Sequence, residues 1–432
     1  MVDSPFSGFV WMMGSRVMTN GRLRVAVLKD RYPMQFMTAR HSRHELDWRR
    51  FLPFTLLSHR LEGFTVLAPG KRVDLVHSSN RIPLGVQKYI LSFEDSAPRR
   101  FGFAQDNLLT RYMDDCIGSH RCRRLVAMSY FARRRFLHQH RDNPMLPALQ
   151  DKLTVRYPNI ILRDAPDPLR DDPCTELVLT FVGAHFARKG GCVAVKIAEK
   201  AKAAGLPIRV NVISPLEMGA AIWTDPEREG FYDEYKDLLT LDNVDYSARL
   251  PNDVMRGKLR QSHFCVLTTF ADSFGFSGIE AMAEHTPVLG TRVCALPEVV
   301  QDDVNGILID MPVDSLGMWV RPADTPRSSP AYEGYFRSEV DRIAQGAIER
   351  LAPLVGDGET VQAMRRAARA TAEARFDSHT ASQYWDALYA EVADEDLASV
   401  PRRREPLLPD PAPLKRSEFG GSFAYSFDSQ QH

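Results

Sequence analysis

Two carboxylates stand on either side of a glycine turn in the segment Asp272-Ser-Phe-Gly-Phe-Ser-Gly-Ile-Glu280. The apolar run before it, residues 263–269, is typical of a buried strand, and the segment itself is typical of a turn into a helix. Gly275 lets the backbone approach a ligand closely. The free N–H groups that follow it, beginning with Phe276 and Ser277, lie at the positive end of the predicted helix, where phosphate oxygens bind well.

The two acids add hydrogen-bond acceptors to this turn. Glu280 can accept two hydrogen bonds from a vicinal diol such as a ribose, and Asp272 can hold a second polyol. The spacing therefore predicts a site for a phosphorylated, hydroxyl-rich ligand. The alternative is an ordinary capping box, in which Ser277 and Glu280 satisfy the helix N-terminus and Asp272 only favours its dipole. Taken alone, the segment fits both interpretations equally well.

A second glycine turn follows the apolar run 177–182, in the segment Gly183-Ala-His-Phe-Ala-Arg188-Lys189-Gly-Gly. It matches neither the Rossmann G-x-G-x-x-G pattern nor a Walker loop, whose lysine precedes serine or threonine. It does offer helix N–H groups and a lysine ammonium as counter-ion for a diphosphate. Arg188 and Lys189 alone would be a solvated surface pair, but the strand, turn and helix around them favour a phosphate site.

Composition narrows the class of protein. The 432 residues predict two domains, and 44% hydrophobic with 25% charged residues is typical of a globular protein. Fifty-five basic and fifty-five acidic side chains argue against a general nucleic-acid binder. Six cysteines without a C-x-x-C pair favour reduced thiols in the cytosol over disulfides or a zinc site. We expect no signal peptide, and membrane contact only at the surface of a bilayer.

Short apolar runs predict an open α/β sheet early in the chain, at residues 22–28, 64–67, 73–76, 89–92 and 125–128. The polar, proline-rich stretch 163–173 is interpreted as an interdomain linker, and residues 311–335 as an extended insertion before helices at 337–351 and 361–375. The predicted parts are an extension (1–20), a first Rossmann-like domain (21–170), a second one (171–375), a closing helix that returns to the first domain (376–395) and a disordered tail (396–432).

The order and spacing of several motifs in the second domain resemble GT-B glycosyltransferases, specifically the retaining glycosyltransferase family 4. The resemblance rests on Phe181-Val-Gly183, Lys189-Gly190, Asp272-x7-Glu280 with Phe274-Gly275 inside it, Glu280-Ala-Met-Ala283, Thr286-Pro-Val288, Leu296-Pro-Glu298-Val-Val300 and Asn305-Gly306-Ile-Leu308. Phe376 to Tyr389 resembles the closing helix of that family. The resemblance implies two Rossmann-like doubly wound domains facing a cleft.

It also implies roles for individual residues. Lys189 and the backbone amides of Gly275, Phe276 and Ser277 should contact the donor diphosphate, with Gly183 and Arg188 beside them. Glu280 should hold the ribose, and Asp272 should lie against the transferred sugar. In this family the sugar is transferred with retention, by front-face attack within a short-lived ion pair, and without a metal or other cofactor. The enzyme stabilises the departing diphosphate and positions the acceptor.

Three positions depart from the family pattern. Asp272 stands where the family has glutamate, which shortens the acid by one methylene. Ala184 replaces an arginine, which removes one cation from the diphosphate unless His185 or Arg188 substitutes for it. The usual Gly-Gly loop after the first strand is absent, and residues 29–33 stand there instead. These departures favour a non-catalytic relative more than they affect the expected fold.

The first domain offers two further candidates. Glu94 follows a predicted strand and is interpreted as a catalytic group that positions or deprotonates an acceptor hydroxyl, although a plain loop carboxylate fits at least as well. Residues 121–141 hold seven arginines and no acid. Such a stretch can sit on anionic lipid, but a solvated helix face is the favoured interpretation.

The resulting hypothesis is a cytoplasmic, retaining hexosyltransferase that moves a sugar from a nucleotide-diphosphate donor to a hydroxyl acceptor, with peripheral membrane contact as an open point. No nucleic acid partner, metal or cofactor is expected. The alternatives are a non-catalytic nucleotide-sugar-binding protein or partner subunit of the same fold, and a nucleotide-sugar epimerase.

Overall fold

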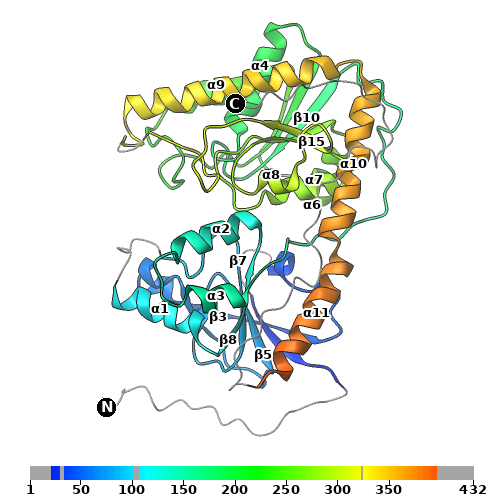
Figure 1. Cartoon of the computed structure of the whole chain (residues 1–432). Helices are drawn as coiled ribbons and strands as arrows, with labels where there is room; N and C mark the ends of the chain where they lie inside the picture. The colour runs from blue at the N-terminus through cyan, green and yellow to red at the C-terminus, as the bar shows by residue number, and fades with distance from the viewer. Residues whose placement is uncertain (1–20, 30–33, 101–106, 323–324, 397–432) are drawn as a thin grey trace, which may run out of the picture. The chain divides into compact units, whose positions relative to one another are not determined.

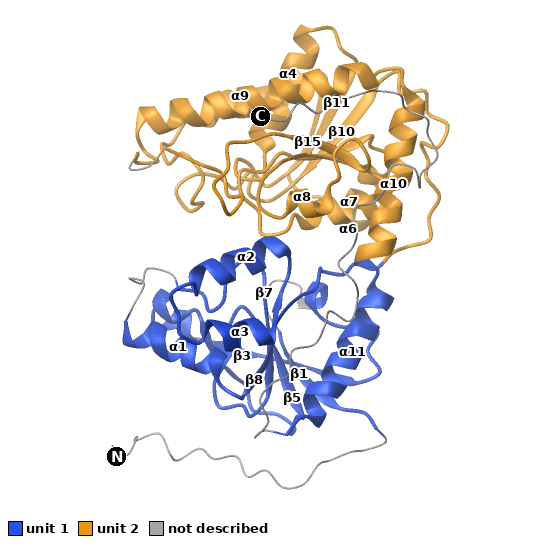
Figure 2. Ribbon diagram, viewed as in Figure 1, with its two compact units in different colours: residues 1–161, 376–410 blue, residues 162–375, 411–432 orange. Residues whose placement is uncertain are grey.

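The computed structural model describes residues 21–29, 34–100, 107–322 and 325–396 (Figure 1). Within these ranges, residues up to 161 and from 376 onward form one compact unit, and residues 162–375 form a second (Figure 2). The predicted extension 1–20 and the predicted tail beyond Asp396 lie outside the described residues, as does most of the loop 29–33. No described helix is both long and apolar enough to cross a membrane.

Unit 1 is built on a parallel six-stranded sheet in the order β2-β1-β5-β7-β8-β9. In this order the chain adds β2 on one side of β1 and the later strands on the other side, as in a doubly wound sheet. The strands are β1 (Arg24–Leu28), β2 (Glu45–Arg49), β5 (Leu75–Ser79), β7 (Tyr89–Phe93), β8 (Cys122–Ala127) and β9 (Leu153–Val155). The charged edge strand β2, Glu-Leu-Asp-Trp-Arg, has no apolar run and was not predicted.

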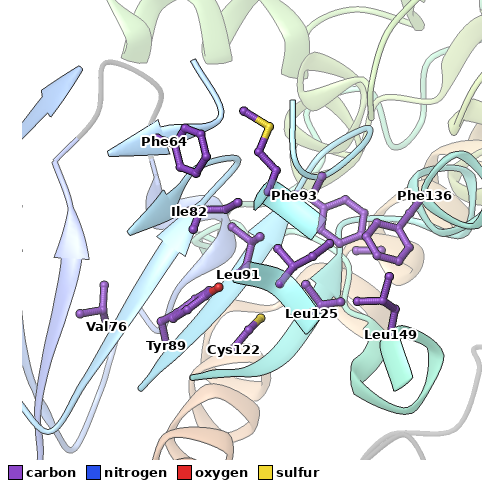
Figure 3. Packing of buried hydrophobic residues seen from close by; sticks show 14 of the residues in the cluster. Phe64, Val76, Ile82, Tyr89, Leu91, Phe93, Cys122, Leu125, Phe136 and Leu149 are labelled. Atoms are coloured by element: carbon purple, nitrogen blue, oxygen red, sulfur yellow. The ribbon is translucent and has the colours of Figure 1, made fainter. Parts of the chain in front are cut away.

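The sheet has a hydrophobic core on each of its two faces, because successive side chains of a strand point to opposite faces. On one face, Leu91 and Leu125 pack with Phe136 of α2 (Tyr130–Gln139) and Leu149 of α3 (Leu146–Lys152), as Figure 3 shows. Met113 of α1 (Leu108–Gly118) belongs to the same core. On the other face, Ile90 and Val126 pack with Trp385 and its neighbours on α11 (Ser378–Asp394). The helix near the end of the described chain therefore completes the unit that the beginning of the chain forms.

A small second sheet differs from the prediction for residues 64–67. These residues form β4 (Phe64–Leu67), but β4 pairs antiparallel with β3 (Phe51–Pro53) and parallel with β6 (Ile82–Pro83), outside the main sheet. The prediction that this run joins the main sheet is wrong. Its local β-propensity identified the strand, whereas its partner depends on tertiary contacts. Three short 3-10 helices complete the unit: η1 (Met34–Met37), η2 (Phe54–Leu56) and η3 (His59–Leu61).

The arginine-rich stretch 121–141 is not one amphipathic helix. Its first part is the buried strand β8, and its second part is α2, whose N-cap is Ser129. Arg123 and Arg124 are buried and form ion pairs with Glu391 and Glu395 near the end of α11. Because these two side chains are buried against α11, the stretch does not present all seven arginines to lipid or to solvent. Both interpretations of the whole stretch, as a lipid-binding surface and as a solvated helix face, are therefore wrong.

Unit 2 contains a parallel six-stranded sheet in the order β12-β11-β10-β13-β14-β15. Numbered within the unit, this is the 3-2-1-4-5-6 order of a Rossmann fold, which reverses between β10 and β13. The strands are β10 (Leu177–Val182), β11 (Ile208–Ile213), β12 (Val244–Ser247), β13 (Phe264–Leu267), β14 (Val288–Thr291) and β15 (Gly306–Ile309). The predicted α/β class with two doubly wound domains is confirmed.

The helices of unit 2 are α4 (Gly191–Ala203), α5 (Asp233–Asp237), α6 (Asn252–Arg260), α7 (Phe276–Ala283), α8 (Leu296–Val299), α9 (Pro330–Leu351) and α10 (Gly358–Phe376), with η4 (Leu238–Thr240) and η5 (Ala352–Leu354). The expected insertion ends earlier than predicted. Ser329 caps α9 and Pro330 occupies its first turn, where a missing N–H costs nothing.

The stretch 163–173 packs against unit 2 instead of forming a free linker. Asp167 in this stretch accepts a hydrogen bond from Nε of Arg365 at 2.9 Å. The Arg365 side chain is fully buried. A buried guanidinium must be paired, so this contact fixes the polar stretch to α10.

Candidate active site

The two glycine turns singled out in the sequence lie at the same edge of the unit 2 sheet. β10 and β13 are adjacent and parallel, with Phe181 opposite Val266, so their carboxyl ends meet. Each strand leads through a glycine turn into a helix, β10 into α4 and β13 into α7. Two helix N-termini at a topological switch point form a place where phosphate groups bind in open α/β sheets.

Glycine is required at the start of both helices. Gly190 precedes α4 with φ +93°, and Gly275 precedes α7 with φ +82°. A Cβ atom on Gly190 would lie 2.3 Å from Oγ1 and 2.4 Å from the carbonyl oxygen of Thr268, which follows β13. The two turns are thus in direct backbone contact. They are also joined by hydrogen bonds from Phe270 N and Thr269 Oγ1 to the carbonyl oxygen of Arg188, each 2.9 Å.

Lys189 and Asp272, one from each turn, form an ion pair with 2.9 Å between Nζ and Oδ2. Asp272 is only 8% exposed. Burial opposes ionisation of this carboxyl, but the charges of Lys189 and Arg188 outweigh burial, and the pKa of Asp272 lies below its usual value. The site therefore holds an ionised acid paired with Lys189 and within reach of the Arg188 charge.

The start of α7 excludes the capping-box interpretation. The N-cap of α7 is Gly275, so Ser277 is the second residue inside the helix, and no side chain caps this end. The Ser277 hydroxyl is buried, and its Oγ has no hydrogen-bond partner among the residues described. Ser277 therefore does not act as the cap of α7.

Glu280 lies one turn into α7 and is partly exposed. Burial raises the pKa of the neighbouring Cys265 thiol to about 12, the Glu280 carboxylate adds to this rise, and the Lys189 ammonium opposes it. Both charged groups are thus close enough to Cys265 to affect its ionisation. Gly183 lies on the other side of Lys189, where a Cβ atom would be 3.0 Å from Cδ of that lysine.

Glu94, the candidate from the first domain, lies in unit 1 directly after β7. Its carboxylate accepts hydrogen bonds from Nδ2 of Asn80 at 3.3 Å and from Arg99. Arg99 also pairs with Glu62 at 2.8 Å. The Glu94 carboxylate is thus engaged by Asn80 and Arg99 at the strand end, and its proposed part in acceptor activation stays a prediction.

Sequence reasoning missed one acid near this site. Asp225 lies in the loop after β11 and is fully buried, with Oδ1 accepting from Thr224 Oγ1 at 2.9 Å and Oδ2 accepting from Gly219 N at 3.2 Å. Burial raises its pKa to about 6, against these hydrogen bonds and the charges of Arg188 and Arg327. No motif surrounds Asp225, and an acid in a loop is ordinarily solvated, so the sequence held no signal for it.

The structure brings Asp172, Cys174 and His263 together, which the sequence did not predict, with ligand atoms within 4.8 Å of one another. The donor set does not fit a metal ion. Nδ1 of His263 accepts a hydrogen bond from Val178 N at 2.8 Å, so the ring proton is on Nε2 and that nitrogen has no lone pair for a metal. Burial raises the pKa of Cys174 to about 11, which keeps it a thiol. The cluster is a polar contact within unit 2.

Residues 171–317, which contain both glycine turns, match the family described as Glycosyl transferases group 1. D-inositol 3-phosphate glycosyltransferase of Segniliparus rotundus is 30% identical over 139 residues, which is 32% of this chain and 30% of that protein. The protein of the same name from Acidothermus cellulolyticus is 27% identical over 138 residues, 32% of this chain and 31% of that protein. The chain thus spans about a third of the length of these relatives.

Solved structures agree on the fold over most of the chain. The crystal structure of Anabaena Alr3699/HepE in complex with UDP has a TM-score of 0.53 at 13% identity, covering 85% of this chain and all of that one. A glycosyltransferase from Rickettsia africae has a TM-score of 0.51 at 15% identity, covering 75% and 78%. The fold is that of GT-B glycosyltransferases.

Proposed function

We propose that this chain is a retaining glycosyltransferase that transfers a sugar from a nucleotide-diphosphate donor to a hydroxyl acceptor without a metal. The observation that carries the proposal is the Lys189–Asp272 ion pair between the N-termini of α4 and α7. It combines a cation and helix N–H groups for a diphosphate with a buried carboxylate for a sugar. The names of the relatives and of the UDP-bound Anabaena structure support the same chemistry.

In the proposed reaction the bond between the sugar C1 and the diphosphate oxygen breaks, and the electron pair leaves with the diphosphate. Lys189 and the amides at the start of α7 stabilise that negative charge, which develops only as the bond breaks. The acceptor oxygen forms the new bond to C1 on the same face, and its proton passes to the departing diphosphate oxygen. Asp272 accepts hydrogen bonds from the sugar, and Glu280 from the ribose.

Isothermal titration with UDP-, GDP- and ADP-glucose, followed by transfer and hydrolysis assays, tests the proposal. Lys189→Ala should abolish donor binding, because it removes the cation that faces the diphosphate. Lys202→Ala is the matched control, since Lys202 lies on α4 and forms an exposed ion pair with Asp242. If Lys189→Ala perturbs folding by leaving Asp272 unpaired, the double variant Lys189→Ala, Asp272→Asn removes that charge as well. Donor binding unchanged in both Lys189 variants contradicts the proposal.

Two outcomes separate the alternatives. If a donor binds but is not consumed in the presence of hydroxyl acceptors, a non-catalytic binding protein is favoured. The observation that supports this alternative is Asp272, whose side chain is one methylene shorter than the glutamate of the family pattern. Conversion of the sugar while it stays attached to the diphosphate, detected by proton NMR of the nucleotide sugar, favours an epimerase.

A further inference from the structure

The guanidinium of Arg188 is held in one orientation at the edge of the proposed donor site. Its Nε and Nη2 lie 3.1 Å and 2.7 Å from Nδ1 of His185, and its Nη1 donates to the carbonyl oxygen of Ala271 at 2.6 Å. Ala271 immediately precedes Asp272, and the Arg188 charge lowers the pKa of that acid. The guanidinium therefore bridges the two glycine turns beside the Lys189–Asp272 pair.

Both hydrogen-bond acceptors of Arg188 are neutral groups. An imidazole and a carbonyl fix the orientation of a guanidinium without cancelling its charge, whereas a carboxylate would do both. No carboxylate oxygen lies within ion-pair distance of Arg188 among the described residues. The Arg188 guanidinium is thus held in one orientation, and its positive charge is available to bind an anion.

The tautomer of His185 follows from the same contacts. Nδ1 receives N–H groups, so it carries no proton, and the ring proton is on Nε2, which faces Oε2 of Glu217 at 3.5 Å. Glu217 is also tied to this turn through its backbone, because Phe186 N donates to Glu217 O at 2.8 Å and Glu217 N donates to Ala184 O at 3.0 Å. The loop after β11 therefore holds His185 in the orientation that Arg188 needs.

We infer that His185 is a positioning residue that orients Arg188 as the second cation, beside Lys189, for the donor diphosphate. The inference rests on the proposed function. A diphosphate flanked by Lys189 and Arg188 meets two cations and one acid, and a planar guanidinium can contact two phosphate oxygens at once. Arg188 then supplies the charge that Ala184, at the start of the turn, does not.

This arrangement requires a neutral His185. Burial and the charges of Arg188 and Lys189 lower the pKa of His185, while Glu217 and Asp272 oppose that shift. Protonation puts a hydrogen on Nδ1, removes the acceptor and repels the guanidinium. Because the pKa of His185 lies below the ordinary imidazole value of about 6.5, donor affinity should be constant at neutral pH and fall only at a pH lower than that value. A nucleotide sugar is a suitable probe because its diphosphate, substituted at both ends, does not titrate in this range.

The test measures the dissociation constant of whichever of UDP-, GDP- and ADP-glucose binds the full chain, between pH 5 and 8. Arg188→Ala should weaken binding about 10- to 100-fold, the range for a hydrogen bond to a charged group. His185→Ala should weaken binding less and abolish the fall at low pH, and His185→Asn should restore affinity at every pH, since an amide oxygen replaces Nδ1 as acceptor. Arg209→Ala, which removes an exposed arginine of β11, is the charge-matched control.

The outcomes separate this inference from the proposed function. Wild-type affinity in Arg188→Ala, with binding lost in Lys189→Ala, overturns the inference and leaves the proposed function standing. Wild-type affinity in both variants overturns both. An unchanged pH profile in His185→Ala, or no recovery in a folded His185→Asn, overturns the positioning role of His185.

Discussion

Gly190 and Gly205 flank the two ends of α4, and both have positive φ, +93° and +65°. Alanine at either position must adopt a left-handed backbone, which costs about 1–2 kcal/mol. The surroundings of the two glycines differ. A Cβ atom on Gly205 meets nothing within 4 Å, whereas one on Gly190 lies 2.3 Å and 2.4 Å from two oxygens of Thr268. The pair of substitutions therefore separates backbone strain from steric overlap.

The structure sets the expected magnitudes. Gly205→Ala should cost the backbone strain alone, about 1–2 kcal/mol. Gly190→Ala should add overpacking of about 1–3 kcal/mol, because one of the atoms it meets belongs to the backbone and cannot rotate away. The total for Gly190→Ala is about 2–5 kcal/mol, and at about 2–4 °C per kcal/mol for a domain of this size the two melting temperatures should differ by several degrees.

Thermal and urea unfolding followed by far-ultraviolet circular dichroism measure this difference. The transition of unit 2 is expected to move with each substitution, and further for Gly190→Ala. Equal losses in the two variants would refute the reasoning, since they would mean that the turns after β10 and β13 are not in backbone contact.

Two further predictions concern the buried polar groups. Asp225→Asn should change the pH dependence of unit 2. A folded-state pKa of about 6, above the ordinary aspartate value of about 3.8, makes the native acid destabilising as the pH rises from 4 to 6, by about 3 kcal/mol in full. The melting temperature of the variant relative to the wild type should thus increase between pH 4 and pH 7, and a constant difference contradicts the burial argument. Ser277→Ala should alter stability by less than about 0.5 kcal/mol, because its hydroxyl has no partner among the described residues, whereas Ser129→Ala should cost about 1 kcal/mol through loss of the α2 cap. Urea midpoints compare the two, and equal losses would restore the capping-box interpretation of Ser277.

Local patterns in the sequence were sufficient for much of unit 2. The apolar run 177–182 forms β10 with the same bounds, and the predicted helix 361–375 lies within α10, because apolar runs and their spacing encode local conformation directly. β2 was missed and β4 was assigned to the wrong sheet for a common reason. β2 is charged and forms only because it pairs with β1, and β4 leaves the main sheet because β3 is its neighbour. Pairing partners are distant in the chain, and no short window of sequence contains them.

The features of the candidate site likewise separate into those that local sequence predicts and those that depend on the fold. The helix starts at Gly190 and Gly275, each after a buried strand, could be predicted from the sequence, since glycine, turn and apolar run are local signals. The pairing of Lys189 with Asp272, the hydrogen bonds of Arg188 to His185, and the burial of Arg123 and Arg124 against α11 all depend on the tertiary structure. The order of the strands sets which loops meet, and the charge and hydrogen bonding of each side chain follow from that meeting.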